Sequence, residues 1–512
     1  MNASEKSDYS APVGGPDAVE EGLVMEVAAA ADLAEYHRLD QVFQGTRLFR
    51  VLPQLVFIYL PAYVDRSNIG NAKLFGAEAD MHLSSQQWNT GLSVFFVTFS
   101  FFAIPSNMML KRFGQKIWLP TLATGVGIIQ ICSGLQSSYA GWISFRLLLG
   151  MVEAGMYSGC TYTLTTWYSP KEIHTRMTVF YSAASLSGAF SGLLAYGIGQ
   201  LDYTWGYRGW RFIYVIEGLL TTVVGILAYF FIYTDPARVG AWLDDDERRF
   251  LALRHRFAAG NSKTTGSASG IAEQEEGVSA KHVRAALKSF HVWAIIVFMF
   301  MVCVIVYGVS FVLPTIIANL GYTAANAQAM TVPPYVFAAL CTVAVGWLAD
   351  RYEQRMLSVV IPLCFAAIGC AMIMAAVRFQ HVEGVTLLGC FIMAGGMYPI
   401  TPTATAWIAL NIAGSTKRAV AISSMACFTG LGGIIGSNVF LAWQAPEYTT
   451  AFSLIIAMIF FMGIVWPIVY WVILKRINAK RAAMPLSEVY AKYTVEELQD
   501  MGDESPLFFY AT

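Results

Sequence analysis

Residues 291–317 read HVWAIIVFMFMVCVIVYGVSFVLPTII, and this stretch contains no Asp, Glu, Lys or Arg. A helix needs about 20 predominantly apolar residues to cross the hydrocarbon core of a bilayer. Such a helix also satisfies its own backbone N–H and C=O groups, which lipid cannot do. Residues 291–317 are therefore predicted to form a membrane-spanning helix.

The same pattern recurs along most of the chain. Of the 512 residues, 56% are hydrophobic and only 13% are charged, whereas a soluble domain carries about 25% charged residues. The mean hydropathy of +0.52 indicates that much of the apolar surface faces lipid. Further spans are predicted at 51–72, 88–109, 117–137, 142–164, 177–199, 211–233, 331–349, 357–377, 384–408, 419–443 and 451–474.

A long polar gap divides these spans into two sets of six. Residues 258–279 within it are rich in Gly, Ser, Thr and Glu, a composition typical of a disordered linker. The predicted fold class is an all-α membrane protein with twelve transmembrane helices in two six-helix bundles. The predicted parts are an N-terminal tail at 1–46, a first bundle at 47–233, a linker at 234–290, a second bundle at 291–475 and a C-terminal tail at 476–512.

The positions of lysine and arginine predict the orientation, because cytosolic loops are enriched in both. The loops predicted to face outward hold only Lys73, Arg208, Arg211 and Arg378. Apart from two arginines inside spans, every other Lys and Arg falls in a segment on the opposite side. Both termini are therefore predicted to be cytosolic. The N-terminal segment has no cleavable signal core, so the first helix is expected to direct insertion.

Composition and motif content disfavour several classes of function. The net charge of −1 gives no basis for nucleic-acid binding. The cysteines form no CxxC pair, and the sequence contains no P-loop or HExxH motif. No metal or cofactor is therefore expected, and the chain is not expected to be an enzyme.

Two loops at equivalent places in the two halves echo each other. Residues 346–355 read GWLADRYEQR, and residues 107–116 read NMMLKRFGQK. The first of these resembles the signature loop of the major facilitator superfamily. The resemblance implies a transporter with two lobes that move against each other.

The loop motif also predicts a gate on the inner face. An aspartate in such a tight turn can cap the N-terminus of a neighbouring helix and pair with arginine. Gly346, Asp350 and Arg351 are therefore predicted to close the inner end. Lys111 stands where the acid would be in the first half, so Lys111 and Arg112 are expected to make the gate asymmetric.

More specific motifs point to one branch of this superfamily. DRSNIGNA at 65–72, RLLLGMVEAG at 146–155 and GWRF at 209–212 resemble three helices of the anion:cation symporter family. NIAGSTKR at 411–418 and GDESPLFFY at 502–510 are similar to the fungal allantoate permease branch. The resemblance implies proton-coupled transport of carboxylate nutrients and vitamins such as allantoate, nicotinate, pantothenate or biotin.

Two predicted helices carry charges at membrane depth. The apolar run 51–64 spans only roughly 21 Å at 1.5 Å per residue, so the first helix must continue through Asp65 and Arg66 to complete the crossing. In the fourth helix, Arg146 and Glu153 lie on one face, two turns apart. A charge at the centre of a membrane helix costs at least about 2.5–3.5 kcal/mol, so these side chains are expected to be paired or functional.

The chemistry of these groups suggests a role for each. Arg66 is predicted to bind the carboxylate of an organic anion, since its planar fork matches a carboxylate. Glu153 is predicted to carry the coupled proton, with Asp65 as its partner acid and Arg146 as a second substrate-binding or tuning cation. The alternative is that these residues form buried ion pairs that only fix helix packing.

The remaining predicted substrate contacts are polar or aromatic. Asn68 lies beside Arg66, Tyr157 shares a helix face with Glu153, and the second half offers Tyr307 and Asn411. Ordinary helix packing is the alternative interpretation for each of them.

The sequence thus predicts a secondary active transporter that couples protons to a small organic anion by alternating access in the plasma membrane. Its expected partners are the anion, protons and the lipid bilayer, with no partner subunit required. Export of an acidic secondary metabolite by proton antiport and nutrient sensing without transport stay open as alternatives. The sequence identifies neither the anion nor the direction of transport.

Overall fold

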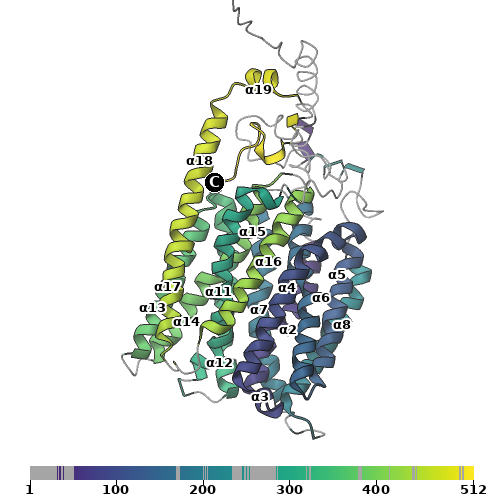
Figure 1. Cartoon of the computed structure of the whole chain (residues 1–512), viewed down its shortest axis with the longest axis vertical. Helices are drawn as coiled ribbons and strands as arrows, with labels where there is room; N and C mark the ends of the chain where they lie inside the picture. The colour runs from purple at the N-terminus through teal and green to yellow at the C-terminus, as the bar shows by residue number, and fades with distance from the viewer. Residues whose placement is uncertain are drawn as a thin grey trace, which may run out of the picture.

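The computed structural model describes residues 51–168, 173–199, 206–232, 286–318, 324–378, 383–413, 415–440, 447–494 and 501–512, with single positions between them. This described part is helical and contains no strand. It forms one elongated bundle whose long axis runs along most of the helices (Figure 1). Most of the predicted tail at 1–46 and most of the predicted linker lie outside the described residues.

The first half of the chain contributes seven described helices. They are α2 (Val51–Leu74), α3 (Ala77–Asp80), α4 (Ser85–Phe113), α5 (Gln115–Gly134), α6 (Tyr139–Trp167), α7 (Ile173–Gly199) and α8 (Gly209–Phe231). The short α3 follows α2 at one end of the bundle (Figure 1).

The second half is more interrupted. Its helices are α11 (Phe290–Ala318), α12 (Ala324–Tyr352), α13 (Leu357–Arg378), α14 (Glu383–Met397), α15 (Ile400–Leu410), α16 (Ser415–Val439), α17 (Thr449–Met458), the π-helical turn η6 (Ile459–Val465), α18 (Trp466–Ala482), α19 (Leu486–Lys492) and the 3-10 turn η7 (Gly502–Glu504). The span predicted at 384–408 is divided between α14 and α15, and Pro399 is the N-cap of α15. A proline there cannot donate the backbone hydrogen bond that would continue α14.

The described residues contain ten helices that are long and apolar enough to cross a membrane. The predicted spans 51–72 and 142–164 are not among them, although both regions are helical as α2 and α6. These are the two helices that carry the charges at membrane depth. Such helices are stable in a membrane when their polar face is turned into the bundle.

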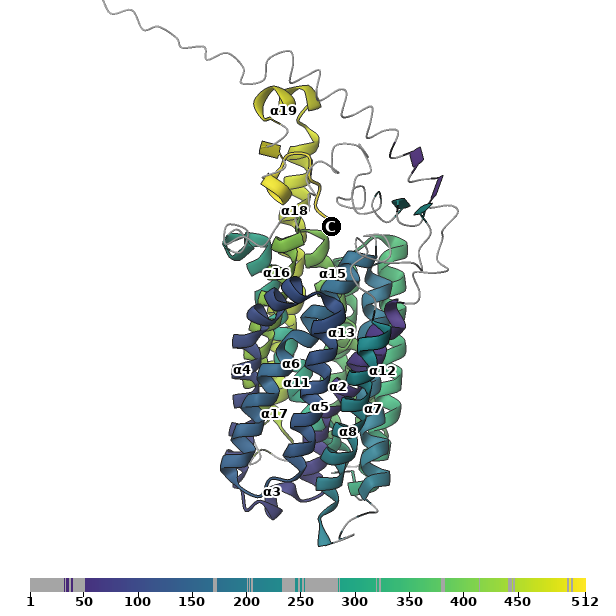
Figure 2. The ribbon, with the colours of Figure 1, turned by 90° about the vertical axis from the view of Figure 1, so that its right-hand side faces the viewer.

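Helices from the two halves of the chain pack directly on each other. α7 lies along α12, and α4 lies along α16, while α2 contacts α7, α8 and α11. The C-terminal segment 501–512 lies at the opposite end of the bundle from α3 (Figure 2). These two ends are called the tail end and the α3 end below.

Candidate functional site

An ion pair between α2 and α6 lies inside the bundle. Arg66 Nη2 contacts Glu153 Oε1, and both side chains are nearly inaccessible. Arg66 Nη1 donates a hydrogen bond of 2.6 Å to the hydroxyl of Tyr307 on α11. Within the described residues, Arg66 Nε and Glu153 Oε2 have no hydrogen-bond partner. The guanidinium therefore links the two halves and keeps one donor unused.

Aromatic rings surround this guanidinium. The ring centroids of Tyr63, Phe95, Phe99 and Tyr307 lie 5.3, 5.3, 5.0 and 5.7 Å from Arg66 Cζ. Cation–π contacts of this kind stabilise a desolvated cation by up to about 2 kcal/mol. The rings thus help to hold the positive charge in place without neutralising it.

Two cavities meet at Arg66. The larger, of about 570 Å³, extends toward the α3 end and is lined by Tyr63, Arg66, Gly70, Asn71, Ala184, Gly188, Ser191, Tyr307, Ser310, Phe311, Pro314, Thr331, Tyr335 and Tyr398. The smaller, of about 430 Å³, extends toward the tail end and is lined by Tyr59, Tyr63, Arg66, Phe99, Tyr157, Tyr181, Met299, Cys303, Val306, Tyr307, Thr401, Met425, Ala426 and Thr429. Arg66, Tyr63 and Tyr307 line both, so one cation faces the two cavities.

Asp65 points to a different set of partners from its neighbour Arg66. Its Oδ2 accepts a hydrogen bond of 3.1 Å from Thr221 on α8, and its backbone carbonyl lies 3.5 Å from the Gln130 amide on α5. Asp65 is completely buried and lines neither cavity. Adjacent residues of one helix therefore face different neighbours, and the four charges predicted at membrane depth are divided between two sets of contacts.

Arg146 also lies away from the cavities. Its Nη2 donates to the Tyr214 hydroxyl on α8 at 3.0 Å. Its Cζ lies 4.3 Å from the centroid of the Trp142 ring, which stacks on Trp88. Arg146 therefore lines neither cavity in this conformation, and its contact with substrate stays a prediction. Its electrostatic influence nevertheless reaches both Glu153 and Asp65.

Glu217 on α8 is a buried acid that the sequence analysis did not assign to the site. It is 2% exposed, and neither carboxyl oxygen has a hydrogen-bond partner within the described part of the chain. Asp65 lies within electrostatic range of it. A signal was present in the sequence, since Glu217 is an acid inside the apolar stretch 211–233.

Asn68 does not line the larger cavity but contacts a residue that does. Its Oδ1 accepts a hydrogen bond of 2.8 Å from Ser191, whose hydroxyl in turn accepts one of 2.5 Å from Asn71. Ser191 and Asn71 line the cavity, whereas Asn68 does not. Asn68 therefore positions cavity residues and does not face the cavity itself.

Tyr157 and Tyr307 are the predicted polar residues that do line the cavities. The Tyr157 hydroxyl lies 2.7 Å from Thr405 Oγ1 on α15, so it joins α6 to the second half. Tyr307 lines both cavities and accepts from Arg66. The structure thus places one phenol at each side of the Arg66 pair.

Asn411 lies at the tail end and contacts the C-terminal segment. Its side-chain oxygen accepts from the Ala511 N–H at 2.7 Å, and its amide donates to the Ala511 carbonyl at 3.3 Å. The indole of Trp407 donates to the same carbonyl at 2.9 Å. In this conformation a backbone segment far away in sequence occupies the amide of Asn411, and its role as a substrate contact stays a prediction.

Other side chains fix this C-terminal segment to the ends of α16 and α18. Lys417 Nζ lies 2.5 Å from Asp503 Oδ1, and Asp503 is completely buried. Arg481 donates to the carbonyl of Asp503 at 3.0 Å, and Asn478 donates to that of Tyr510 at 2.8 Å. Burial raises the pKa of Tyr510 to about 12 despite the nearby Arg481 cation. The phenol therefore stays protonated and donates to the Asp503 carbonyl at 2.7 Å.

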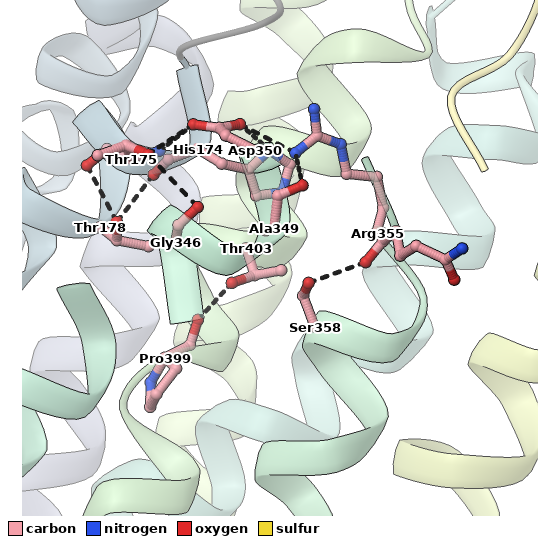
Figure 3. Close-up of polar contacts among 11 residues, drawn as sticks. His174, Thr175, Thr178, Gly346, Ala349, Asp350, Arg355, Ser358, Pro399 and Thr403 are labelled. Carbon is pink, nitrogen blue, oxygen red and sulfur yellow. Dashed lines mark hydrogen bonds and ion pairs between the residues drawn. The ribbon is translucent and has the colours of Figure 1, made fainter. Parts of the chain in front are cut away.

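The C-terminal end of α12 contacts the start of α7 at the tail end (Figure 3). Asp350 Oδ2 lies 2.7 Å from both the N–H and the hydroxyl of Thr175, close to the N-terminus of α7. Arg355 Nη1 donates to Asp350 Oδ1 at 3.0 Å. A Cβ atom at Gly346 would overlap Thr178, so glycine permits this close approach. The structure thus places Asp350 against a helix N-terminus, as the motif predicts.

The equivalent loop of the first half makes different contacts. Lys111 lies 5.9 Å from the Tyr162 ring centroid and Arg112 lies 6.0 Å from that of Phe113. The contact across the halves comes from Asn107, whose amide donates to the carbonyl of Ala419 at 3.0 Å. Arg351 in the second half lies over the Trp347 ring. At the tail end, the two halves are therefore joined by an aspartate contact on the α12 side and by an asparagine contact on the α4 side.

The described residues contain no group of three or more His, Cys, Asp or Glu side chains placed to hold a metal ion. The polar centre of the bundle consists instead of acids, arginines and phenols. Such a set can exchange a proton and bind an anion.

Comparison with known proteins agrees with this architecture. The family model described as Major Facilitator Superfamily matches residues 55–437 and 295–489. An MFS-type transporter of Penicillium expansum, cnsO, is 36% identical over 98% of this chain and 99% of its own length. The high-affinity nicotinic acid transporter of Saccharomyces cerevisiae is 27% identical over 85% of this chain and 78% of its own.

A solved structure shows the same fold. The proton:xylose symporter XylE, bound to 6-bromo-6-deoxy-D-glucose, superposes with a TM-score of 0.63 at 15% sequence identity. The match covers 90% of this chain and 100% of that one. The chain therefore belongs to the Major Facilitator Superfamily and is a multi-pass membrane transporter.

Proposed function

We propose that this transporter couples the movement of a proton to that of a small organic anion, in the same direction, by alternating access. The observation that carries the proposal is the Arg66–Glu153 ion pair beside two cavities. A substrate carboxylate entering either cavity meets a guanidinium that already holds a carboxylate. The two anions compete for one cation.

This competition provides the coupling. When Glu153 is ionised, it occupies Arg66 and disfavours the substrate. When Glu153 takes up a proton, its attraction for Arg66 is reduced and the guanidinium can form charge-assisted hydrogen bonds to the substrate. Proton and anion therefore bind together, and the core carries the same charge loaded as empty. A core with an unchanged charge can reorient across the membrane with or without its cargo.

The cavity walls favour a substrate with a flat, apolar body. Seven tyrosines line one or both cavities, and they are Tyr59, Tyr63, Tyr157, Tyr181, Tyr307, Tyr335 and Tyr398. Offset stacking on such rings favours an aromatic over a linear aliphatic carboxylate. One relative is named for nicotinic acid, which is a flat aromatic carboxylate. Among the carboxylates implied by the resemblance to fungal allantoate permeases, we therefore favour the aromatic ones as substrates.

Asp350 and Thr175 supply the closure that alternating access requires at the tail end. We assign this end to the cytosol, because the lysine- and arginine-rich segments gather there, and the membrane to the plasma membrane. An anion entering through the larger cavity from the α3 end would then be taken up into the cell.

Uptake of radiolabelled nicotinate, pantothenate, biotin and allantoate by transport-deficient yeast tests the proposal. Accumulation should rise at acidic external pH, collapse with an uncoupler and be greatest for nicotinate. Glu153→Gln should lose pH-driven accumulation but still exchange internal for external substrate, since glutamine mimics a protonated acid. Glu383→Gln, an exposed acid at the start of α14, is the matched control.

The outcomes distinguish this mechanism from its alternatives. Unchanged accumulation by Glu153→Gln would exclude Glu153 as the coupling group. Efflux from preloaded vesicles without uptake would indicate antiport. Binding without movement in either direction would indicate a receptor.

A further inference from the structure

Two buried acids, Glu217 on α8 and Asp65 on α2, lie within electrostatic range of each other, and Thr221, one helical turn after Glu217, donates to Asp65. Glu217 is 2% exposed and Asp65 is completely buried. Within the described residues, both oxygens of Glu217 and Oδ1 of Asp65 lack a hydrogen-bond partner. Asp65 is the charged group whose influence reaches Glu217. The pair therefore has more acceptor oxygens than donors to satisfy them.

The groups packed around the pair supply little positive charge to offset an ionised Glu217. On α6, Arg146 and Glu153 both act on Asp65, and their opposite charges offset one another there. The hydroxyl of Thr221 on α8 already donates to Asp65 Oδ2. From α5 comes Gln130, a neutral amide whose nitrogen faces the Asp65 carbonyl.

Tyr214, the remaining neighbour on α8, adds no positive charge beside Glu217. Tyr214 lies within electrostatic range of Glu217, but its hydroxyl accepts from Arg146. Helix packing also closes the region beside Glu217, because a Cβ at Gly218 would lie 2.7 Å from the backbone nitrogen of Ile131 on α5. Glu217 thus faces a second acid in a closely packed helix contact.

A charge count gives the same result. Among the buried charged residues of α2, α6 and α8, Arg66 and Arg146 stand against Asp65, Glu153 and Glu217, while the buried Arg355, Lys417 and Asp503 lie at the tail end. If all five were ionised, one negative charge would remain uncompensated in a low-dielectric interior, which is far more costly than binding a proton. Two adjacent carboxyl groups commonly resolve such an excess by sharing one proton.

We propose that Asp65 and Glu217 form an acid pair that binds one proton between them, at a site distinct from Glu153. Neither acid lines the two cavities, whereas Glu153 is bonded to the cavity residue Arg66. The proton turns one carboxyl into a hydrogen-bond donor for the other. This leaves the core formally neutral with Arg66–Glu153 as a separate pair.

Infrared spectroscopy of the purified full-length protein tests this assignment directly. A protonated carboxyl group has a carbonyl stretch well separated from that of a carboxylate and from the amide band. The unmodified protein at neutral pH should show this band. Glu217→Gln should abolish it, because Asp65 then lies between a neutral amide and Arg146 and can ionise. Asp65→Asn should keep the band at a shifted frequency, because Glu217 is then alone and stays protonated.

Two further variants locate the proton. Glu153→Gln should leave the band in place, while Glu217→Asp, which retains an acid, should keep it if Glu217→Gln fails to fold. Glu383→Gln controls for the loss of one exposed glutamate. Absence of the band in the unmodified protein, or its persistence in Glu217→Gln, would overturn the proposal. The readout requires no transported substrate, so it stands or falls separately from the proposed symport.

Discussion

At the scale of single residues, the proposed mechanism makes Arg66 the link between binding and coupling, because three kinds of group would compete for its donors. Glu153 takes Nη2, Tyr307 takes Nη1, and the two cavities give a substrate access to the same guanidinium. A lysine in this position would keep the charge. It would lose the planar fork that allows two or more of these contacts at once.

Arg66→Lys is therefore expected to weaken substrate binding. Loss of one charge-assisted hydrogen bond costs about 2 kcal/mol, or roughly thirtyfold in affinity. Equilibrium binding to the purified protein, with the carboxylate that the uptake panel identifies, measures the change. Arg378→Lys alters an exposed arginine at the end of α13 and should bind as the unmodified protein does. Equal affinities for the two variants would show that the fork is not used.

The sequence predicts which residues carry charge in the membrane better than it predicts their partners. Asp65 and Arg66 follow from the short apolar run before them, since the helix has to continue to complete the crossing. Their partners depend on how α2 is rotated against α6 and α8, which no local pattern encodes. Asn411 shows the same limit, because its partner Ala511 lies a hundred residues away.

At the scale of elements, the contact between the C-terminal end of α12 and the start of α7 joins two halves that, in the proposed alternating access, have to separate when the tail end opens. The Asp350 carboxylate accepts two donors from Thr175 and pairs with Arg355. Its charge also lies near the positive end of the α7 helix dipole. The contact thus favours the state in which the tail end is closed.

Asp350→Asn should shift this balance toward the open state. Asparagine keeps an acceptor for Thr175 but loses the ion pair and most of the dipole interaction, about 1–2 kcal/mol together. We expect the maximal transport rate to fall several-fold while the KM changes little, because Asp350 lies outside both cavities. Initial-rate uptake over a range of substrate concentrations separates the two parameters.

Arg351→Ala is the comparison for this prediction. Arg351 adjoins Asp350 but lies over the exposed ring of Trp347, so its removal should affect the rate less. If Arg351→Ala lowered the transport rate more than Asp350→Asn, the assignment of the closure to Asp350 would be wrong. A raised KM in Asp350→Asn would point to a role in binding.

Element boundaries were predictable where apolar length decides them and less so where irregular backbone intervenes. Uncharged runs such as α11 follow directly from hydropathy. The division into α14 and α15 follows from prolines that the sequence displays. The π-helical turn η6 between α17 and α18 has no comparable signal, because it lies in an unbroken apolar segment.

At the scale of the whole molecule, the C-terminal segment ties together helix ends that are distant in sequence. It bonds Asn411 after α15, Lys417 on α16, and Asn478 and Arg481 on α18. The Thr512 carbonyl also lies 3.4 Å from the backbone nitrogen of Arg355, whose side chain bonds Asp350. The segment therefore contacts the second-half side of the proposed gate, an arrangement that no local sequence pattern of residues 501–512 predicts.

Removal of the Lys417 charge tests how much this tie contributes to stability. Lys417→Ala leaves Asp503 buried and ionised without its ammonium partner, a change that costs about 3–5 kcal/mol when the acid stays buried. We expect a clear fall in the midpoint of thermal unfolding of the detergent-solubilised protein. The double variant Lys417→Ala/Asp503→Ala should recover much of the loss, since it removes the unpaired charge along with its partner. If the double variant is no more stable than Lys417→Ala, or if Lys417→Ala unfolds at the unmodified midpoint, the buried pair does not hold the segment in place. The position of the segment would then depend on its other hydrogen bonds, which involve the backbone of Asp503, Tyr510 and Ala511.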